Sequence, residues 1–545
     1  DRVDLRILAR TMRIDTGRLG IPVYISLCGP DASRVTGTQK QMGKGATPAQ
    51  SEASALMELI ERFSFFSFMK NHPFPFHVHA ELSRSAIHPE LLKRSLHDTS
   101  TPDHLCREVL KGLPMRWVMS RNLTRGEDQW IPIDWFYLIN EYNGPAAGNT
   151  LEEAVLQSLC EVVERHVGSV VSHDELATPA IDPESLRDPA AVELVRKFLQ
   201  QGIQLHLLDF SLDTGIPTVG ALAYDPSTFP EKSEIIFTAG TTPNPEKSLC
   251  RALTEIAQLA GDFQTHTSYK PTLPKYSRLE EARYLMGNGG KVPITALPNL
   301  DHDNLRVEIE RCVESLARIG LEVFVVNVTH QEIGVPAVYT IVPGAHFLER
   351  TRDTDFPQHA ARILLKTLGR DRMAREMERL LEVFGPRYDL TFFMAHALEL
   401  EGEVESALAL FQRALGQDPD PRELASIHVH IGSCYKDMED YQKALESLAE
   451  AEKFNKELKE IYNLRGFCHY KLKQHQEAIA AFERAIELDP GSAIDYANIG
   501  SNLRELGFKE EAVKLYKMAL ELDPTIDFAR DNVLRLEGSL NRESG

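Results

Sequence analysis

The sequence has few cysteines, and none of them stand close together. The seven cysteines lie singly along the chain, with no Cys-x-x-Cys pair. This spacing excludes a zinc ribbon and an iron–sulfur motif, and it argues against a disulfide scaffold. Isolated cysteines are typical of reduced thiols, so we expect a cytoplasmic protein.

Long apolar runs and an excess of positive charge are also missing. The densest apolar patch, residues 63–69, is too short for a membrane-spanning helix, which needs about 20 apolar residues. The formal net charge is −20, which argues against a large nucleic-acid interface. We therefore expect neither a membrane nor a nucleic acid as a partner. Residue 1 is Asp rather than Met, so a preceding segment or a cleaved signal stays open.

The last third of the chain contains an internal repeat. Gly432, Gly466 and Gly500 are spaced 34 residues apart, and alanine and proline positions recur with the same period. Small residues let two helices pack closely, and proline ends a helix. The period and the residue types resemble tetratricopeptide repeats, which form an all-α solenoid. The resemblance implies four copies over residues 388–524 and a capping helix over residues 525–540.

Residues 1–355 have a different pattern. The full length of 545 residues allows two to four domains at about 100–200 residues each. Short β-rich runs alternate with helical segments before residue 356, which predicts a mixed α+β domain. We expect residues 356–387 to be a helical connector to the repeat domain, residues 388–545. The β-rich runs are Val323–Val328, Ala337–Val342, Leu205–Phe210 and Ile235–Thr238.

Three segments of the N-terminal domain share one design. Each has a glycine-containing loop, beginning at Gly43, Ala147 or Ala239, followed by a helical segment with polar residues at positions i, i+4 and i+7. This spacing places the polar side chains on one stripe of each helix. In the first two segments the matching residue numbers all differ by 103. The polar residues are Ser54, Glu58, Glu61 and Arg62, then Gln157, Glu161, Glu164 and Arg165, then Arg251, Glu255 and Gln258.

Paired acids on mostly apolar helices need a compensating cation. Carboxylates without His or Cys partners suit Mg²⁺, which usually binds phosphate oxygens as well. A glycine-rich loop before a helix offers backbone N–H groups to phosphates, and Lys44 would neutralise their charge. The alternative is a solvated helix face with local ion pairs. The Gly-x4-Gly-Lys-Ser/Thr motif is missing, so the site is not a P-loop.

These segments resemble a known family. Gly43–Arg62, Asn143–Arg165 and Arg251–Gln258 resemble the ATP-binding segments of the YcaO family, and Gly334–Gly344 is similar to its late strand and turn. The resemblance covers about residues 15–350. It implies an enzyme that uses ATP and Mg²⁺ to phosphorylate the oxygen of a peptide-backbone amide after a nucleophile has added. Phosphate then leaves, and an azoline, a thioamide or an amidine forms.

The same resemblance implies roles for individual residues. The metal ligands would be Glu58, Glu61, Glu161 and Glu164. The ATP-binding residues would be Lys44, Ser54, Arg62, Asn149, Gln157, Arg165, Glu255 and Gln258. No further catalytic residue is assigned, because phosphoryl transfer depends on positioning and charge neutralisation more than on a protein nucleophile.

The sequence departs from the family pattern in two places. The family commonly has an arginine shortly after the position of Gln258, where this chain has Ala260, Gly261 and Asp262. This puts the role of the third motif in ATP turnover in question. The proline-rich C-terminus of azoline-forming members is also absent, which argues against an azoline-forming role. Members with a helical-repeat tail include ones tied to modification of a ribosomal protein.

We therefore predict ATP- and Mg²⁺-dependent amide activation, with the repeats docking a peptide or protein substrate or a sulfur-donating partner protein. Family members are often homodimers, and we expect one here. Two alternatives stay open: a non-catalytic YcaO-like scaffold that acts through its repeats, and an azoline-forming cyclodehydratase. Cys160 is expected to be a small buried side chain rather than a nucleophile. His72, His77 and His79 are expected in a surface loop rather than in a metal site.

Overall fold

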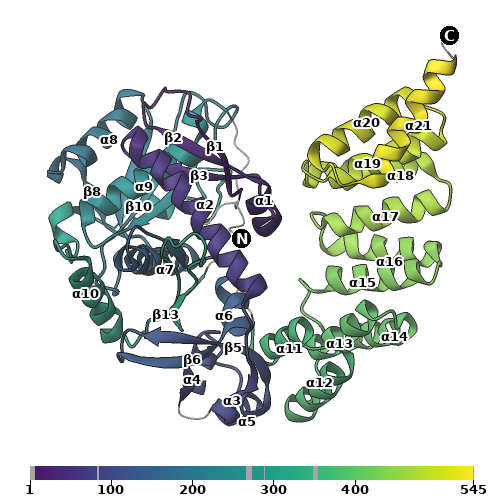
Figure 1. Cartoon of the computed structure of the whole chain (residues 1–545), viewed down its shortest axis with the longest axis horizontal. Helices are drawn as coiled ribbons and strands as arrows, with labels where there is room; N and C mark the ends of the chain where they lie inside the picture. Colours follow the sequence, from purple (N-terminus) through teal and green to yellow (C-terminus); the bar gives the residue numbers. More distant parts are fainter. Residues whose placement is uncertain (1–5, 83–84, 266–272, 288, 348–353, 544–545) are drawn as a thin grey trace. The chain divides into compact units, whose positions relative to one another are not determined.

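The computed structural model describes residues 6–82, 85–265, 273–287, 289–347 and 354–543. The chain forms two units, residues 1–359 and residues 360–545, each of which is described by itself. The first unit mixes helices with three sheets, and the second is a run of consecutive helices (Figure 1), which confirms the predicted fold class. Among the described helices, none has the length and apolar character needed to cross a membrane.

Three sheets form the scaffold of the first unit. The smallest contains β1 (Leu8–Arg13), β2 (Val23–Cys28) and β3 (Lys40–Lys44), paired antiparallel in that order. The second has the order β11 (Ile236–Thr241), β10 (Thr218–Tyr224), β9 (Gln204–Asp209), β8 (Ala180–Asp182), β12 (Lys291–Pro293). The third has the order β4 (Phe76–Val78), β5 (Pro114–Asn122), β13 (Phe324–Asn327), β14 (Ala337–Ile341), β7 (Pro145–Ala147), with β6 (Glu127–Pro132) also paired to β5.

Three long helices follow directly after strands, and each of these strands belongs to a different sheet. They are α2 (Pro48–Asn71) after β3, α7 (Leu151–His173) after β7, and α9 (Pro245–Leu259) after β11. The other helices of this unit are α1 (Pro30–Thr36), α3 (His79–Leu82), α4 (Pro89–Arg94), α5 (Asp103–Gly112), α6 (Ile133–Asn140), α8 (Pro189–Gln200) and α10 (Leu305–Arg318). Short 3₁₀ turns lie at Pro183–Ser185, Gly261–Phe263, Arg283–Leu285 and Ile294–Ala296.

The core beneath the second sheet explains why its strands form. Phe198 of α8 and Leu253 of α9 are fully buried, and they belong to the same apolar cluster as Val219 and Ala221 of β10. Every residue of β11 is buried, as is most of β10, so both faces of these strands are covered. The predicted β-rich runs are confirmed, because they correspond to β9, β11, β13 and β14.

The second unit is built from paired antiparallel helices. The pairs α13 with α14, α15 with α16, α17 with α18 and α19 with α20 pack most closely, and each pair also contacts the next along the chain (Figure 1). The helices are α11 (Phe356–Thr367), α12 (Arg370–Phe384), α13 (Tyr388–Leu400), α14 (Val404–Leu415), α15 (Leu424–Asp437), α16 (Tyr441–Phe454), α17 (Lys459–Lys471), α18 (His475–Leu488), α19 (Ala493–Glu505), α20 (Lys509–Leu522) and α21 (Asp527–Glu543).

The repeating small residues lie where the paired helices cross. A Cβ atom added at Gly466 of α17 would lie 2.6 Å from the ring of Phe482 on α18. The recurring alanines, such as Ala444, Ala478 and Ala512, are fully buried. The 34-residue period therefore marks close helix crossings, as the sequence predicted.

Candidate active site

The helices α2, α7 and α9 begin in the same way. Their N-caps are Thr47, Thr150 and Asn244, and each cap side chain accepts a backbone N–H from the first turn of its helix. Such a cap fixes the first turn and so sets the rotation of every later side chain. The same arrangement of loop and capped helix therefore occurs three times, once after a strand of each sheet.

Counting from these caps shows that the three helices share one register. The first of the three polar columns lies seven residues after the cap, the second eleven and the third fourteen. The columns are Ser54, Gln157 and Arg251, then Glu58, Glu161 and Glu255, then Glu61, Glu164 and Gln258. All three helices thus present their polar stripe at the same distance from their N-termini.

Glycines near the ends of β3 and β11 allow these strands to press against the following helices. A Cβ atom at Gly43 would lie 2.1 Å from the backbone nitrogen of Ala55, and one at Gly240 would lie 2.6 Å from that of Ala252. The Ser51 hydroxyl also donates a hydrogen bond of 2.9 Å to the Gly43 carbonyl. Glycine is required at these points by the close approach of the backbone, which holds the loop on the helix.

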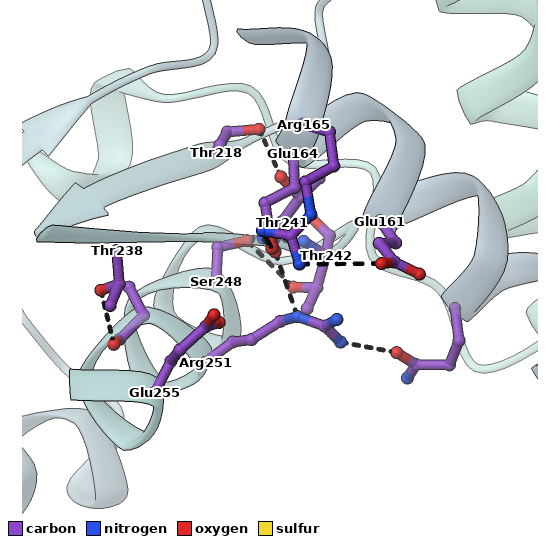
Figure 2. A network of polar contacts seen from close by, with 12 residues as sticks. Glu161, Glu164, Arg165, Thr218, Thr238, Thr241, Thr242, Ser248, Arg251 and Glu255 are labelled. Carbon is purple, nitrogen blue, oxygen red and sulfur yellow. Dashed lines mark hydrogen bonds and ion pairs between the residues drawn. The ribbon is translucent and has the colours of Figure 1, made fainter. Parts of the chain in front are cut away.

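Glu164 connects α7 to the third loop-and-helix segment, which contains Thr241 of β11 and Arg251 of α9. Its side chain is 1% exposed, and its Oε2 accepts hydrogen bonds from the Thr241 backbone N–H at 3.1 Å and from Arg251 Nε at 3.2 Å. Arg251 Nη1 also donates to Gln157 Oε1 at 2.7 Å. Figure 2 shows Arg251 reaching from its helix to Glu164. This arrangement fixes α7 to α9 through one guanidinium group.

Two further arginines lie among the acids. Arg165 lies 3.6 Å from Glu161 and 3.4 Å from Glu164, and Figure 2 shows it turned toward Glu161. Arg62 lies 3.3 Å from Glu61 and donates a hydrogen bond of 2.8 Å to the carbonyl of Tyr142. Burial opposes the charge of both arginines, but the neighbouring glutamates raise the pKa of each above its ordinary value. Both therefore stay charged inside the cluster.

Lys44 and Ser54 lie together at the first loop. The Lys44 ammonium pairs with the carboxylate of Glu255, and the Lys44 backbone N–H donates to Ser54 Oγ at 3.3 Å. Burial alone would raise the pKa of Glu255, but Lys44 and the nearby arginines lower it. Lys44 of β3 thereby joins the segment of β3 and α2 to α9.

Glu58 and Glu61 of α2 are acids whose pKa values are raised in the cluster. Burial raises the pKa of Glu58. The charges of Arg62 and Lys44 lower this pKa, whereas those of Glu161 and Glu255 raise it further. Burial also raises the pKa of Glu61 well above its ordinary value. Within the described part of the chain, Oε1 of Glu61 is buried and accepts no hydrogen bond. This oxygen lies 3.3 Å from Arg62 Nε but accepts no hydrogen bond from the described residues, so it can still take a ligand such as a metal ion.

The donor set fits Mg²⁺ bound together with a phosphorylated ligand. Oε1 of Glu164, like that of Glu61, is buried and has no hydrogen-bond partner among the described residues. Over those same residues, no three of the clustered carboxylates offer oxygens that all lie within 4.8 Å of one another. Mg²⁺ is usually held by one or two carboxylates, with phosphate oxygens and water completing its six ligands. The cluster therefore suits an ion that arrives with phosphate rather than an ion held by protein alone.

Asn149 lies just before α7, and Gln258 lies near the end of α9. The backbone N–H and the side-chain amide of Asn149 both donate to Glu153 Oε2, at 2.9 and 3.0 Å, at the exposed N-terminus of α7. Gln258 is half-buried on α9, one turn beyond Glu255. After α9 the chain turns at Asp262, whose carboxylate accepts hydrogen bonds from the Thr16 hydroxyl and the Arg18 backbone. The segment after the third motif thus anchors the N-terminal strand region.

Cys160 and the histidines near residue 75 have surroundings that indicate no role in catalysis or metal binding. Cys160 is buried, and burial raises the pKa of its thiol to about 12, so it is not an activated nucleophile. His77 contacts Glu81 at 2.9 Å, and His79 contacts the carbonyl of Ile87 at 2.9 Å. In the part of the chain that the structure describes, these histidines belong to no group of three metal-binding side chains.

Arg251 and Thr241 are site residues to which the sequence reasoning assigned no role. The signal for Arg251 was present, because it occupies the same column as Ser54 and Gln157. The Thr241 contact is made by a backbone N–H, so no side-chain pattern marks it.

Comparisons with known proteins identify relatives of both units. A family model described as YcaO cyclodehydratase, ATP- and Mg²⁺-binding, matches residues 42–346. Tetratricopeptide-repeat models match residues 360–420, 425–457, 460–492 and 496–526. These matches confirm both of the resemblances seen in the sequence.

Individual relatives cover different shares of the chain. An uncharacterized protein of Methanothermobacter thermautotrophicus is 30% identical over 353 residues, which are 60% of this chain and 86% of that protein. The ribosomal protein S12 methylthiotransferase accessory factor YcaO of Escherichia coli is 29% identical over 241 residues, 40% of either chain. A solved heterocyclase in complex with substrate and cofactor is 27% identical with a TM-score of 0.52, and the match covers 62% of this chain and 50% of that one. The chain thus spans less than two thirds of the last two relatives.

Proposed function

Since the chain belongs to the YcaO family, we propose that residues 1–355 use ATP and Mg²⁺, the cofactors of this family, to activate a peptide-backbone amide by phosphorylating its oxygen. One observation carries the proposal. Three helices, each following a strand of a different sheet, bring glutamates, arginines and a lysine that are largely removed from solvent into one cluster, and the pKa values of Glu58 and Glu61 are raised there. Protein packing alone does not account for such an arrangement, because uncompensated buried carboxylates are costly.

The proposed roles of the residues are those that the resemblance to the family implies. The metal ligands are the acids of the first two helices, Glu58, Glu61, Glu161 and Glu164. The nucleotide-binding residues are Lys44, Ser54, Arg62, Asn149, Gln157, Arg165, Glu255 and Gln258. When bound, the nucleotide supplies the phosphoryl group that the amide oxygen accepts. Arg62 and Arg165 hold fixed positive charge where phosphate charge develops, which is the main demand of phosphoryl transfer.

Lys44 has a place in this scheme that its contacts suggest. Its ammonium is paired with Glu255, and Glu255 shares a column with Glu58 and Glu161. We propose that Lys44 exchanges this partner for a phosphate oxygen when nucleotide binds. Glu255 would then face the cluster with its charge newly available.

The favoured outcome of the activation is a thioamide. A sulfur nucleophile adds to the amide carbon, the oxygen takes the γ-phosphoryl group, and phosphate leaves with that oxygen as the thioamide forms. We propose that the repeats, residues 388–545, dock the peptide or protein substrate or a sulfur-donating partner, because repeat arrays bind extended peptides on their concave face. Residues 356–387 are the proposed connector, and the enzyme is proposed to act as a homodimer.

Phosphate release by the purified full-length chain tests the proposal. Wild type with Mg²⁺ and ATP should release phosphate, and Glu58→Gln and Glu161→Gln should each abolish the release. Glu152→Gln is the matched control, because this glutamate is exposed in the first turn of α7 and lies outside the cluster. Release that survives both Glu58→Gln and Glu161→Gln would contradict the assignment. Mass spectrometry of the modified peptide separates the products, since a thioamide exchanges oxygen for sulfur and an azoline loses water.

A scaffold role is the second candidate, and the contacts of Asp262 favour it. The segment that carries an arginine in many family members instead anchors Thr16 and Arg18 here. If this change removes nucleotide binding, the repeats are the functional part of the chain. Isothermal titration calorimetry with Mg²⁺ and a non-hydrolysable ATP analogue decides between the two. No measurable heat of binding would support the scaffold.

A further inference from the structure

A second group of metal-binding side chains lies in the repeat unit, away from the acidic cluster. His396 and Glu399 lie three residues apart on α13, and His430 lies on α15. One ligand atom from each of the three lies within 4.8 Å of the other two. Among the described residues this is the one group of three His, Cys, Asp or Glu side chains that meets this condition.

Aromatic neighbours pack on the His430 ring, and Phe392 also contacts the His396 ring, with centroids 6.2 Å apart. The ring of Phe411 stacks on that of His430, with centroids 5.1 Å apart and an angle of 18°. The ring of Phe392 meets His430 edge-on at 5.2 Å, and the two imidazole centroids lie 4.6 Å apart. The Glu399 carboxylate contacts His430 Nδ1 at 2.6 Å and is 11% exposed. Rings held in this way are already oriented for a shared ligand, so little ordering is needed on binding.

The repeat fold does not require these histidines. In the next two copies, 34 and 68 residues on, the position of His430 is taken by Leu464 and Asn498. The residues that recur for helix packing are the small and aromatic ones, such as Gly432 and Ala444. His430 is also half-buried, with 23% of its side chain exposed. The group is therefore specific to the first two helix pairs.

We propose that His396, Glu399 and His430 bind a divalent transition-metal ion, with Zn²⁺ as the reference ion. Two imidazole nitrogens and one carboxylate oxygen suit Zn²⁺ and its neighbours, whereas Mg²⁺ and Ca²⁺ prefer oxygen ligands alone. The ion takes the place of the proton shared by Glu399 and His430. It links α13 to α15 and leaves a fourth tetrahedral position for water or for a donor from a bound peptide. The site is independent of the proposed catalytic function.

Metal binding to the full-length chain tests this proposal. After chelator treatment and without nucleotide, Zn²⁺ is titrated against a competing chromophoric chelator. Wild type should bind one equivalent of Zn²⁺. His396→Gln and His430→Gln should each bind this ion more than about 100-fold more weakly, a larger loss than the usual effect of losing an outer-shell partner. His428→Gln is the matched control, because His428 is half-buried on the same helix and contacts Phe454 instead. Equal Zn²⁺ affinity in wild type, His396→Gln and His430→Gln would overturn the site.

Two further readouts separate a lost ligand from a lost fold. Co²⁺ in a site of nitrogen and oxygen ligands gives visible d–d absorption without a thiolate charge-transfer band, and both ligand variants should lose this absorption. Zn²⁺ should raise the thermal midpoint of the repeat unit in wild type and in His428→Gln, but not in the ligand variants. The ligand variants should keep the helical circular dichroism of the metal-free wild type. A thiolate band in wild type would place the metal on cysteine and refute the site.

Discussion

Replacing Glu61 by glutamine should make the unliganded protein more stable while removing its response to nucleotide. The Glu61 side chain is 15% exposed, its buried Oε1 accepts no hydrogen bond among the described residues, and its pKa is raised well above the ordinary value by burial and then by neighbouring acids. A raised pKa means that the folded state favours the protonated acid, so the ionised form costs stability at neutral pH and this cost disappears as the pH falls. Glutamine resembles the protonated form and removes the cost at pH 7.

The expected size follows from two opposing effects. Relief of an unfavourable site charge typically stabilises a protein by about 0.5–2 kcal/mol, and we take about 1 kcal/mol. A ligand at 100 times its Kd stabilises wild type by about 2.7 kcal/mol. If the lost carboxylate weakens binding about 100-fold, the same ligand concentration stabilises Glu61→Gln by about 0.4 kcal/mol. The order of stability should therefore reverse, with the variant ahead by about 1 kcal/mol without ligand and behind by about as much with it.

Tryptophan fluorescence measures this effect in the correct unit. The three tryptophans, Trp117, Trp130 and Trp135, all lie in the first unit, so their emission follows its unfolding alone. Thermal or urea unfolding is recorded for wild type, Glu61→Gln and the exposed control Glu152→Gln, with and without Mg²⁺ and a non-hydrolysable ATP analogue. The reasoning is refuted if Glu61→Gln is less stable than wild type without ligand and is still stabilised fully by it.

Three further predictions concern the stability of the first unit. Arg251→Met should destabilise it by about 3 kcal/mol, because the buried Glu164 loses a charged partner, as measured by urea unfolding. Gly43→Ala should cost about 3 kcal/mol and lower the thermal midpoint, because the new Cβ would lie 2.1 Å from the backbone nitrogen of Ala55. Burial and then a neighbouring histidine lower the pKa of His166 to about 4, so the unfolded state binds more protons between about pH 4 and 6.5. The first unit should lose about 2 kcal/mol on this account between pH 7 and pH 5, and His166→Gln should reduce that loss.

Each of these predictions has an outcome that contradicts it. Arg251→Lys should recover part of the stability lost in Arg251→Met, and no difference between the two would show that the charge is unimportant. Gly416→Ala should be nearly neutral, since its Cβ would lie 3.5 Å from the nearest atom, and an equal effect at both glycines would argue against crowding at Gly43. A pH profile that is the same for wild type and His166→Gln would exclude this histidine as the titrating group.

The sequence alone predicts the repeat unit and the polar stripes well, because both signals are periodic. The 34-residue period is repeated often enough to mark each helix pair, and the i, i+4, i+7 spacing identifies the inward face of α2 and α7. Strands such as β7 and β8 are only three residues long, which is too short to carry a pattern. They become strands through pairing with β14 and β12, which lie far away in the sequence.

Partner choice inside the cluster could not be read from the sequence. Glu164 pairs with Arg251 and with a backbone N–H of Thr241, and these residues are 87 and 77 positions away. Helical spacing constrains which side chains share a face, but it does not say which of three helices supplies the cation. Asn149 shows the same limit, because its amide turns to Glu153 within the capping turn of its own helix.

The shared register of α2, α7 and α9 has a consequence for how this domain tolerates change in length. The caps Thr47, Thr150 and Asn244 are 103 and 94 residues apart, yet the polar columns begin at the same distance from each cap. The geometry of the cluster is thus measured locally, from cap to column, and not along the whole chain. Insertions or deletions in the loops between the helices would leave the columns aligned, whereas a single residue added between a cap and its column would rotate that helix's polar stripe by about 100°.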